Sequence, residues 1–166
     1  MEESIKRILV PTDLSEESFS AFEYAVALAA EYNSEIILAH VVEPLPRGIG
    51  HWEDISEALE RRAEAARDKL EDFHQQAVAL YPRCRSELHF GPAPQVIRDL
   101  AAKLKVDLIV TSARPRHGIL DRLLGGLPET LVRLASCPVL AVRPSSAPHG
   151  SPHPRPLVTA TVPASI

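Results

Sequence analysis

The sequence predicts an α/β protein: an open, mostly parallel sheet of five strands with helices on both faces. Short apolar runs alternate along the chain with longer segments of helical periodicity, and the alternation continues to a fifth run. The second run, EIILAHVV, is apolar almost throughout, as in a strand that is buried on both faces of a parallel sheet. Right-handed crossovers between such strands place the connecting helices on both faces.

The first half of the chain supplies two strands and two helices. The strands are the runs at 5–11 and 35–42, and Pro11 ends the first of them. The helix between them begins at Ser15, a preferred N-cap residue that is followed by two acidic residues suited to the helix dipole. A long amphipathic helix follows the second strand. Its apolar stripe is Ile55, Leu59, Ala63, Ala66, Leu70, Phe73, Ala77 and Leu80.

The second half supplies three strands and two helices. The strands are predicted at 83–90, 106–111 and 137–144, and the first of these has the weakest pattern. Apolar residues at helical spacing mark the helix before the second of them. They are Val96, Ile97, Leu100, Ala101 and Leu104. The last helix begins at Leu127 and runs toward the final strand.

Residues 1–144 are predicted to form one domain, and residues 145–166 a proline-rich flexible tail. The segment from residue 144 onward carries six of the fifteen prolines of the chain and has no helical period. Its histidines, His149 and His153, make a poor metal site because a flexible segment does not hold ligands in place. No metal is predicted.

Composition excludes several classes of partner. The chain has 166 residues and a net charge of −4, which argues against a nucleic-acid partner bound by bulk charge. No apolar run approaches the roughly 18 residues of a membrane span, so no membrane partner is expected. Cys84 and Cys137 lie far apart and match no metal spacing, as expected of reduced thiols in a cytoplasmic protein.

Three segments follow strands at the edge of the sheet where ligands bind: PTD, HVVEP and TSARPRHG. The last one opens the stretch 112–126, which has three arginines, a histidine and three glycines and is either an anion-binding loop or a solvated basic turn. Asp13 can accept hydrogen bonds from ribose hydroxyls or can cap the turn before the first helix. His40, inside an apolar strand, is expected to be a histidine whose hydrogen bonds are satisfied in the core.

Four stretches of the chain resemble the universal stress protein family. They are ILVPTDLSEESFSAFEYAVALA, ILAHVV, DLIVTSARPRHGILDRLLGG and LVRLASCPVLAVRP, in the right order over residues 5–143. The resemblance implies a Rossmann-like fold of the adenine nucleotide α-hydrolase type, usually homodimeric, cytoplasmic and linked to stress survival. Some members of the family bind ATP and others do not.

Members that bind ATP carry the motif G-x2-G-x9-G-S/T after the fourth strand, and this chain matches one of its four positions. Ser112 and Pro115 stand at the first two glycines, Gly125 matches the third, and Gly126 replaces the Ser/Thr. Gly118 is a common family glycine but is not diagnostic. Proline at the second position has no N–H to donate to a phosphate.

Two compensations remain at this damaged phosphate end. The N–H of Gly126 stays at the start of a helix that has Pro128 in its first turn, a place that favours anions. Arg114, Arg116 and Arg122 can replace lost donors by charge, or they form a solvated basic loop. At the nucleoside end the family pattern is intact. The matching residues are Pro11, Thr12, Asp13 and Val41, whose backbone would border the adenine.

We therefore expect a non-catalytic stress-response protein with weak or absent binding of ATP or another adenine nucleotide. It would form a homodimer through the apolar edge strand from Pro138 to Arg143 and act on protein partners that the sequence does not identify. The alternative is a true ATP-binding member whose loop arginines compensate for the missing glycines. An enzyme is the weakest hypothesis, because no general base or metal cluster stands beside the loop.

Overall fold

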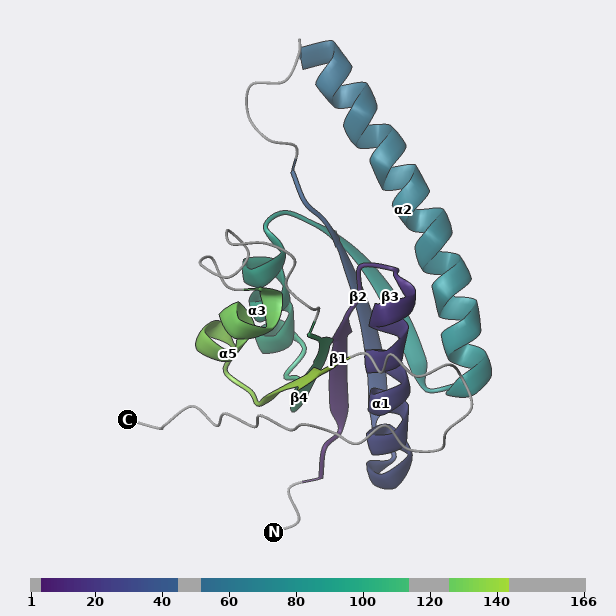
Figure 1. The fold of residues 1–166 in the computed structure, drawn as a ribbon, viewed down its shortest axis with the longest axis vertical. Coiled ribbons are helices and arrows are strands. Elements are labelled where there is room, and N and C mark those ends of the chain that lie inside the picture. Colours follow the sequence, from purple (N-terminus) through teal and green to yellow (C-terminus); the bar gives the residue numbers. More distant parts are fainter. Residues whose placement is uncertain (1–3, 45–51, 114–125, 144–166) are drawn as a thin grey trace.

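The computed structural model describes residues 4–44, 52–113 and 126–143, and its five strands form one sheet in the order β3-β2-β1-β4-β5 (Figure 1). The strands are β1 (Arg7–Pro11), β2 (Glu35–Val42), β3 (Cys84–Phe90), β4 (Leu108–Ser112) and β5 (Val139–Val142). Every neighbouring pair is parallel, which confirms the predicted fold class. The predicted tail lies outside the described residues.

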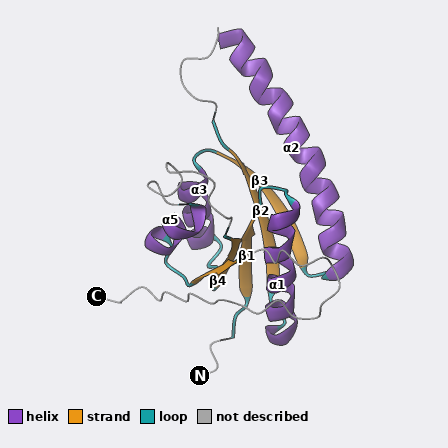
Figure 2. Cartoon of the chain, in the orientation of Figure 1, coloured by secondary structure: helices purple, strands orange, loops and turns teal. Residues whose placement is uncertain are grey.

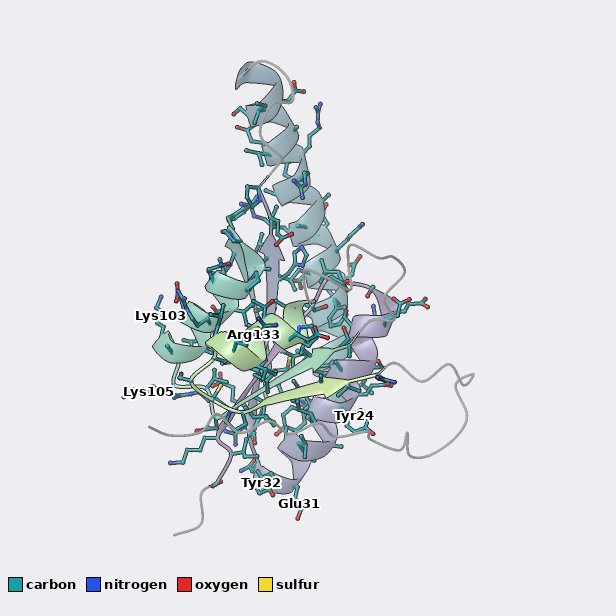
Figure 3. The ribbon with its side chains drawn as sticks, turned by 60° about the vertical axis from the view of Figure 1, so that its left-hand side comes forward. Tyr24, Glu31, Tyr32, Lys103, Lys105 and Arg133 are labelled. Carbon is teal, nitrogen blue, oxygen red and sulfur yellow. The ribbon has the colours of Figure 1, made fainter. Side chains whose placement is uncertain are left out.

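Among the described residues, four helices cover the sheet, two on each face (Figure 2). They are α1 (Glu16–Tyr32), α2 (Trp52–Leu80), α3 (Ala93–Lys103) and α5 (Leu127–Leu134). The predicted N-cap is confirmed, because the Ser15 hydroxyl accepts a hydrogen bond from the Ser18 amide at 3.2 Å. In Figure 3, Tyr24 and Tyr32 mark the layer of α1, whereas Lys103 and Lys105 mark the end of α3.

Each face of the sheet has its own apolar core. Under α1 and α2, the rings of Phe19, Phe22 and Phe73 contact one another, with Phe19 5.4 Å from Phe22 and 5.1 Å from Phe73. Under α3 and α5, Ile97 and Leu131 are fully buried against β1, β2 and β4. Each such side chain contributes about 1.5–3 kcal/mol by leaving water, so both layers fix the positions of the central strands.

Helix α2 is longer than the sheet that it covers. Its 29 residues span about 43 Å, whereas the eight residues of β2 span about 26 Å. The predicted apolar stripe is accordingly buried only in its middle, from Ala63 to Ala77. Leu59 is 37% exposed and Leu80 55% exposed. The amino-terminal end of the helix passes beyond the sheet, whereas its carboxyl-terminal end lies beside the start of β3 (Figure 1).

The amino ends of β1 and β4 are joined by Asp107. Its Oδ2 atom accepts hydrogen bonds from the backbone amides of Lys6 at 2.8 Å and Arg7 at 2.9 Å. The Arg7 guanidinium donates in turn to the carbonyl of Leu104 at 2.8 Å. Asp107 therefore aligns two strands that are a hundred residues apart in the sequence.

The two edge strands differ in chemistry. On β3, Arg85 forms ion pairs with Glu35 at 2.9 Å and with Glu87, and Glu87 also contacts His89 at 2.9 Å. All four residues of β5 are apolar: Leu140 and Val142 pack in the core under α1 and α2, and Val139 packs in the core under α3 and α5. One edge of the sheet thus carries charge and the other does not.

Both cysteines are protonated thiols packed into the fold. Burial, with a smaller contribution from the charge of Glu35, raises the pKa of the Cys84 thiol to about 12. Burial also raises the pKa of the Cys137 thiol. In the unfolded chain both thiols ionise near a pKa of about 8.5, so unfolding releases protons at alkaline pH.

We predict that the free energy of unfolding falls as the pH rises above about 8.5, because the unfolded thiols lose protons that the folded thiols keep. Urea denaturation at pH 7.5 and 9.5 measures the loss in the parent protein and in the variant with Cys84→Ala and Cys137→Ala. The parent should lose more stability than the variant between these two values. An equal loss in both proteins would contradict the raised pKa values.

Candidate functional site

The order of the strands reverses between β1 and β4. From β1 the chain continues to β2 on one side, and β4 lies on the other side. Parallel sheets bind ligands outside the carboxyl ends of the strands at such a reversal. Continuing the register of Leu9 with Ile109 and of Pro11 with Ala39 brings Thr12 level with both Ser112 and His40. The segments that follow β1, β2 and β4, which were predicted to bind the ligand, therefore lie together at the carboxyl ends of the strands.

The turn between β1 and α1 is held by two buried hydroxyls. The Oγ1 atom of Thr12 accepts a hydrogen bond from the Leu14 amide at 3.0 Å and lies 2.7 Å from the Ser18 Oγ atom. Because Ser18 donates its hydroxyl hydrogen to the Ser15 carbonyl at 2.8 Å, Thr12 is the donor to Ser18. The hydroxyl of Thr12 thus maintains the turn, and a ligand would meet other atoms of this segment.

Asp13 is exposed and takes part in the same turn. Its Oδ1 atom accepts hydrogen bonds from the Ser15 amide at 3.1 Å and the Ser15 hydroxyl at 2.5 Å. Of the two roles left open by the sequence, the turn contact is observed, and binding of a ribose stays a prediction. Leu14, the next residue, has a φ of 65° in the left-handed region, where leucine is rare.

The end of β2 contributes a histidine and a valine. The Nδ1 atom of His40 lies 2.8 Å from the carbonyl oxygen of Thr12, so the histidine is satisfied as expected, although its ring is only half-buried. Val41 is also half-buried and packs against the core under α3. Just beyond the strand, the Glu43 carboxylate accepts a hydrogen bond from the Ala93 amide at 3.2 Å and caps α3.

The described part of the phosphate end consists of Ser112 and the start of α5. Ser112 is half-buried and paired with Val142 of β5. Gly126 is the N-cap of α5, and Pro128 lies in the first turn as predicted. A Cβ atom built on Gly126 would lie 3.0 Å from the Glu129 carboxylate, so a larger residue fits here only if that flexible side chain moves.

The rest of the predicted phosphate loop lies outside the described residues. These predicted positions are Arg114, Pro115, Arg116, Gly118, Arg122 and Gly125. The register of the strands therefore places Thr12 level with Ser112 and His40, and the role of the loop stays a prediction.

Two kinds of feature are absent from the described segments. Over residues 4–44, 52–113 and 126–143, no three histidine, cysteine or acidic side chains are grouped so as to hold a metal ion. Among the helices of those same segments, none has the length and apolarity needed to cross a membrane.

Sequence reasoning missed the contacts that hold the site together. The bond from His40 to Thr12 and the buried hydroxyl of Ser18 depend on contacts between elements. A polar signal was present in each case, since a histidine interrupts an apolar strand and a serine lies on the inner side of a helix. Neither signal names its partner: the register of β1 with β2 brings His40 to Thr12, and the turn between β1 and α1 brings Ser18 to the same residue.

Comparison with known proteins agrees with this architecture. The model of the universal stress protein family matches residues 4–143. A universal stress protein of Methanocaldococcus jannaschii is 32% identical over 142 residues, which cover 83% of this chain and 82% of that protein. Universal stress protein A homolog 1 of Coxiella burnetii is 35% identical over 141 residues, 82% of this chain and 95% of that protein.

Solved structures show the same fold. A universal stress protein from Lactobacillus plantarum superposes with a TM-score of 0.73 and 26% identity, covering 86% of this chain and 100% of that one. Because the family model matches residues 4–143 and the curated relatives reach 32–35% identity over most of both chains, the chain belongs to the universal stress protein family.

Proposed function

We propose that this protein is a non-catalytic, cytoplasmic stress-response protein that acts as a homodimer and binds an adenine nucleotide weakly. The observation that carries the nucleotide proposal is the rigid turn of Thr12 and Asp13 at the reversal of strand order. Beside it, the motif for phosphate binding keeps one of its four diagnostic residues, Gly125. The nucleoside would thus bind beside a turn that is held by hydrogen bonds, whereas its phosphates would meet few hydrogen-bond donors.

Two solved proteins of this fold support an adenine nucleotide as the ligand. One is a universal stress protein in complex with cAMP, 24% identical to this chain, and the other is an Arabidopsis thaliana family member with AMP bound, 18% identical. At these identities they share the fold alone with this chain. Both ligands carry a single phosphate. A nucleotide with one phosphate needs fewer hydrogen-bond donors than ATP, which suits a loop that has lost several of them.

The proposal of a non-catalytic role rests on how the polar groups at the edge are used. The hydroxyls of Thr12 and Ser18 and one carboxylate oxygen of Asp13 form hydrogen bonds within the turn. A general base must itself accept a proton from the substrate, and these groups already accept or donate hydrogen bonds within the turn. We therefore propose that they do not act in catalysis.

The competing proposal is an ATP-binding member in which Arg114, Arg116 and Arg122 supply the phosphate contacts.

We predict that restoring the family motif tightens ATP binding. The variant combines Ser112→Gly, Pro115→Gly and Gly126→Ser, and the last change requires the Glu129 side chain to move aside. Two recovered hydrogen bonds to charged phosphates, each worth about 1.5–3 kcal/mol, should lower the dissociation constant by about two to four orders of magnitude, less the entropy of a looser loop. Calorimetry with ATP, ADP and AMP, with and without magnesium, measures this change.

Asp13→Ala in the restored background is the control for the nucleoside end, and it should abolish the gain if Asp13 holds the ribose. Tight ATP binding by the parent protein with its native loop would contradict the proposal. In that case Arg114, Arg116 and Arg122 are the residues to replace, because the compensating arginines would then carry the affinity.

The proposed dimer forms through β5. This strand is an edge of the sheet, and its backbone groups on the outer side face away from β4. The strand is apolar throughout, and Leu140 is half-buried against the core under α1. An apolar edge of this kind favours pairing with the same strand of a second copy.

We predict that Leu140→Lys converts the dimer to a monomer at micromolar concentration, because a charge on β5 would have to be buried between the two copies. Light scattering measures the mass, and circular dichroism checks that the variant stays folded. The matched control is Phe90→Lys on the opposite edge strand, where Phe90 is 55% exposed, and it should leave the dimer intact. A parent protein that is already monomeric would refute the dimer.

A further inference from the structure

Two consecutive residues of β2 hold the backbone of Thr12. Its amide donates to the carbonyl of Ala39 at 2.9 Å, and its carbonyl oxygen lies 2.8 Å from the Nδ1 atom of His40. A carbonyl oxygen only accepts hydrogen bonds, so Nδ1 carries the hydrogen and is the donor. Thr12 comes one residue after the last paired position of β1, Pro11 with Ala39. The His40 side chain therefore adds a hydrogen bond between the two segments just beyond the end of β1.

The bond from His40 acts on the segment that presents Asp13. The Thr12 carbonyl belongs to the planar peptide unit that links Thr12 to Asp13, so fixing its oxygen fixes the orientation of this unit. The next residue, Leu14, must take its left-handed conformation at φ 65°. A backbone conformation that is rarely adopted persists only where surrounding contacts over-determine it. The His40 ring supplies one such contact from the neighbouring strand.

We propose that His40 is a positioning residue of the nucleotide site: its Nδ1–H group orients the turn from Thr12 to Ser15 and thereby the carboxylate of Asp13. The part of this proposal that concerns the nucleotide rests on the proposed function. The part that concerns the turn does not, because it can be measured on the protein without ligand.

The test compares two substitutions at the same position. His40→Asn keeps an N–H donor attached to the Cγ atom, where Nδ1 stands in the parent, whereas His40→Leu fills similar space without a donor. The matched control is His74→Leu. His74 is likewise half-buried and lies 3.2 Å from a backbone carbonyl, that of Cys84, but this bond ties α2 to the start of β3, at the opposite end of the sheet.

The first measurement is hydrogen exchange of the Leu14 and Ser15 amides, which donate to Thr12 and Asp13 within the turn. Exchange of the Ile37 amide in the core is measured beside them, because its rate reports a loss of global stability that local opening of the turn does not cause. His40→Leu should speed exchange of both amides by roughly ten-fold, the effect of losing one hydrogen bond, while His40→Asn and His74→Leu stay within about two-fold of the parent. Unchanged exchange in His40→Leu, or equal acceleration in both His40 variants, overturns the proposal.

The second measurement is the dissociation constant for AMP by calorimetry. His40→Leu should weaken binding by about five- to ten-fold, with His40→Asn and His74→Leu close to the parent. Equal affinity in all four proteins overturns the role of His40 in the nucleotide site. A parent that does not bind AMP refutes the proposed ligand instead, and the exchange rates then still decide whether His40 orients the turn.

Discussion

The burial of the central strands on both faces is the constraint on which the rest of this structure depends. Every residue of β1 from Ile8 to Pro11 is buried, and β2 is buried from Ile36 to Ala39. Such strands have no room for unpaired polar groups along their length. Polar side chains with a specific role can therefore lie only where the central strands end. Those at the amino ends of the strands differ in role from those at the carboxyl ends. Asp107 aligns β1 and β4 at the amino ends of the strands, and the residues predicted to bind a ligand lie at the carboxyl ends.

Much of the fold could be predicted from the sequence because the signals that determine it are local. Alternating apolar runs and helical stripes place each strand within two residues of its observed bounds, and Ser15 identifies the start of α1. The overhang of α2 could not be predicted in this way. The stripe from Ile55 to Leu80 gives the length of the helix, but how far it passes the sheet depends on where β2 and β3 end beside it.

The residues of the candidate site could be predicted from the sequence, but the hydrogen bonds between them could not. Thr12 and Asp13 were identified as positions at the end of a strand, yet the hydroxyl of Thr12 is used inside the turn. The partner of His40 lies 28 residues earlier in the chain, and no periodicity within β2 reports which carbonyl the ring will meet. Contacts of this kind follow from the register between strands, which local patterns leave open.

The difference between the two edge strands has a consequence for stoichiometry. A fibre grows without limit when each subunit offers two complementary surfaces, whereas a closed assembly uses the same surface on every copy. On β3, Arg85 forms ion pairs with Glu35 and Glu87, and covering this edge with another strand would bury those charges. Extension of the sheet beyond β3 is therefore disfavoured, and β5 is the edge through which we propose that two copies pair. Any pairing through β5 consumes the single apolar edge of both molecules, and growth ends with the second copy.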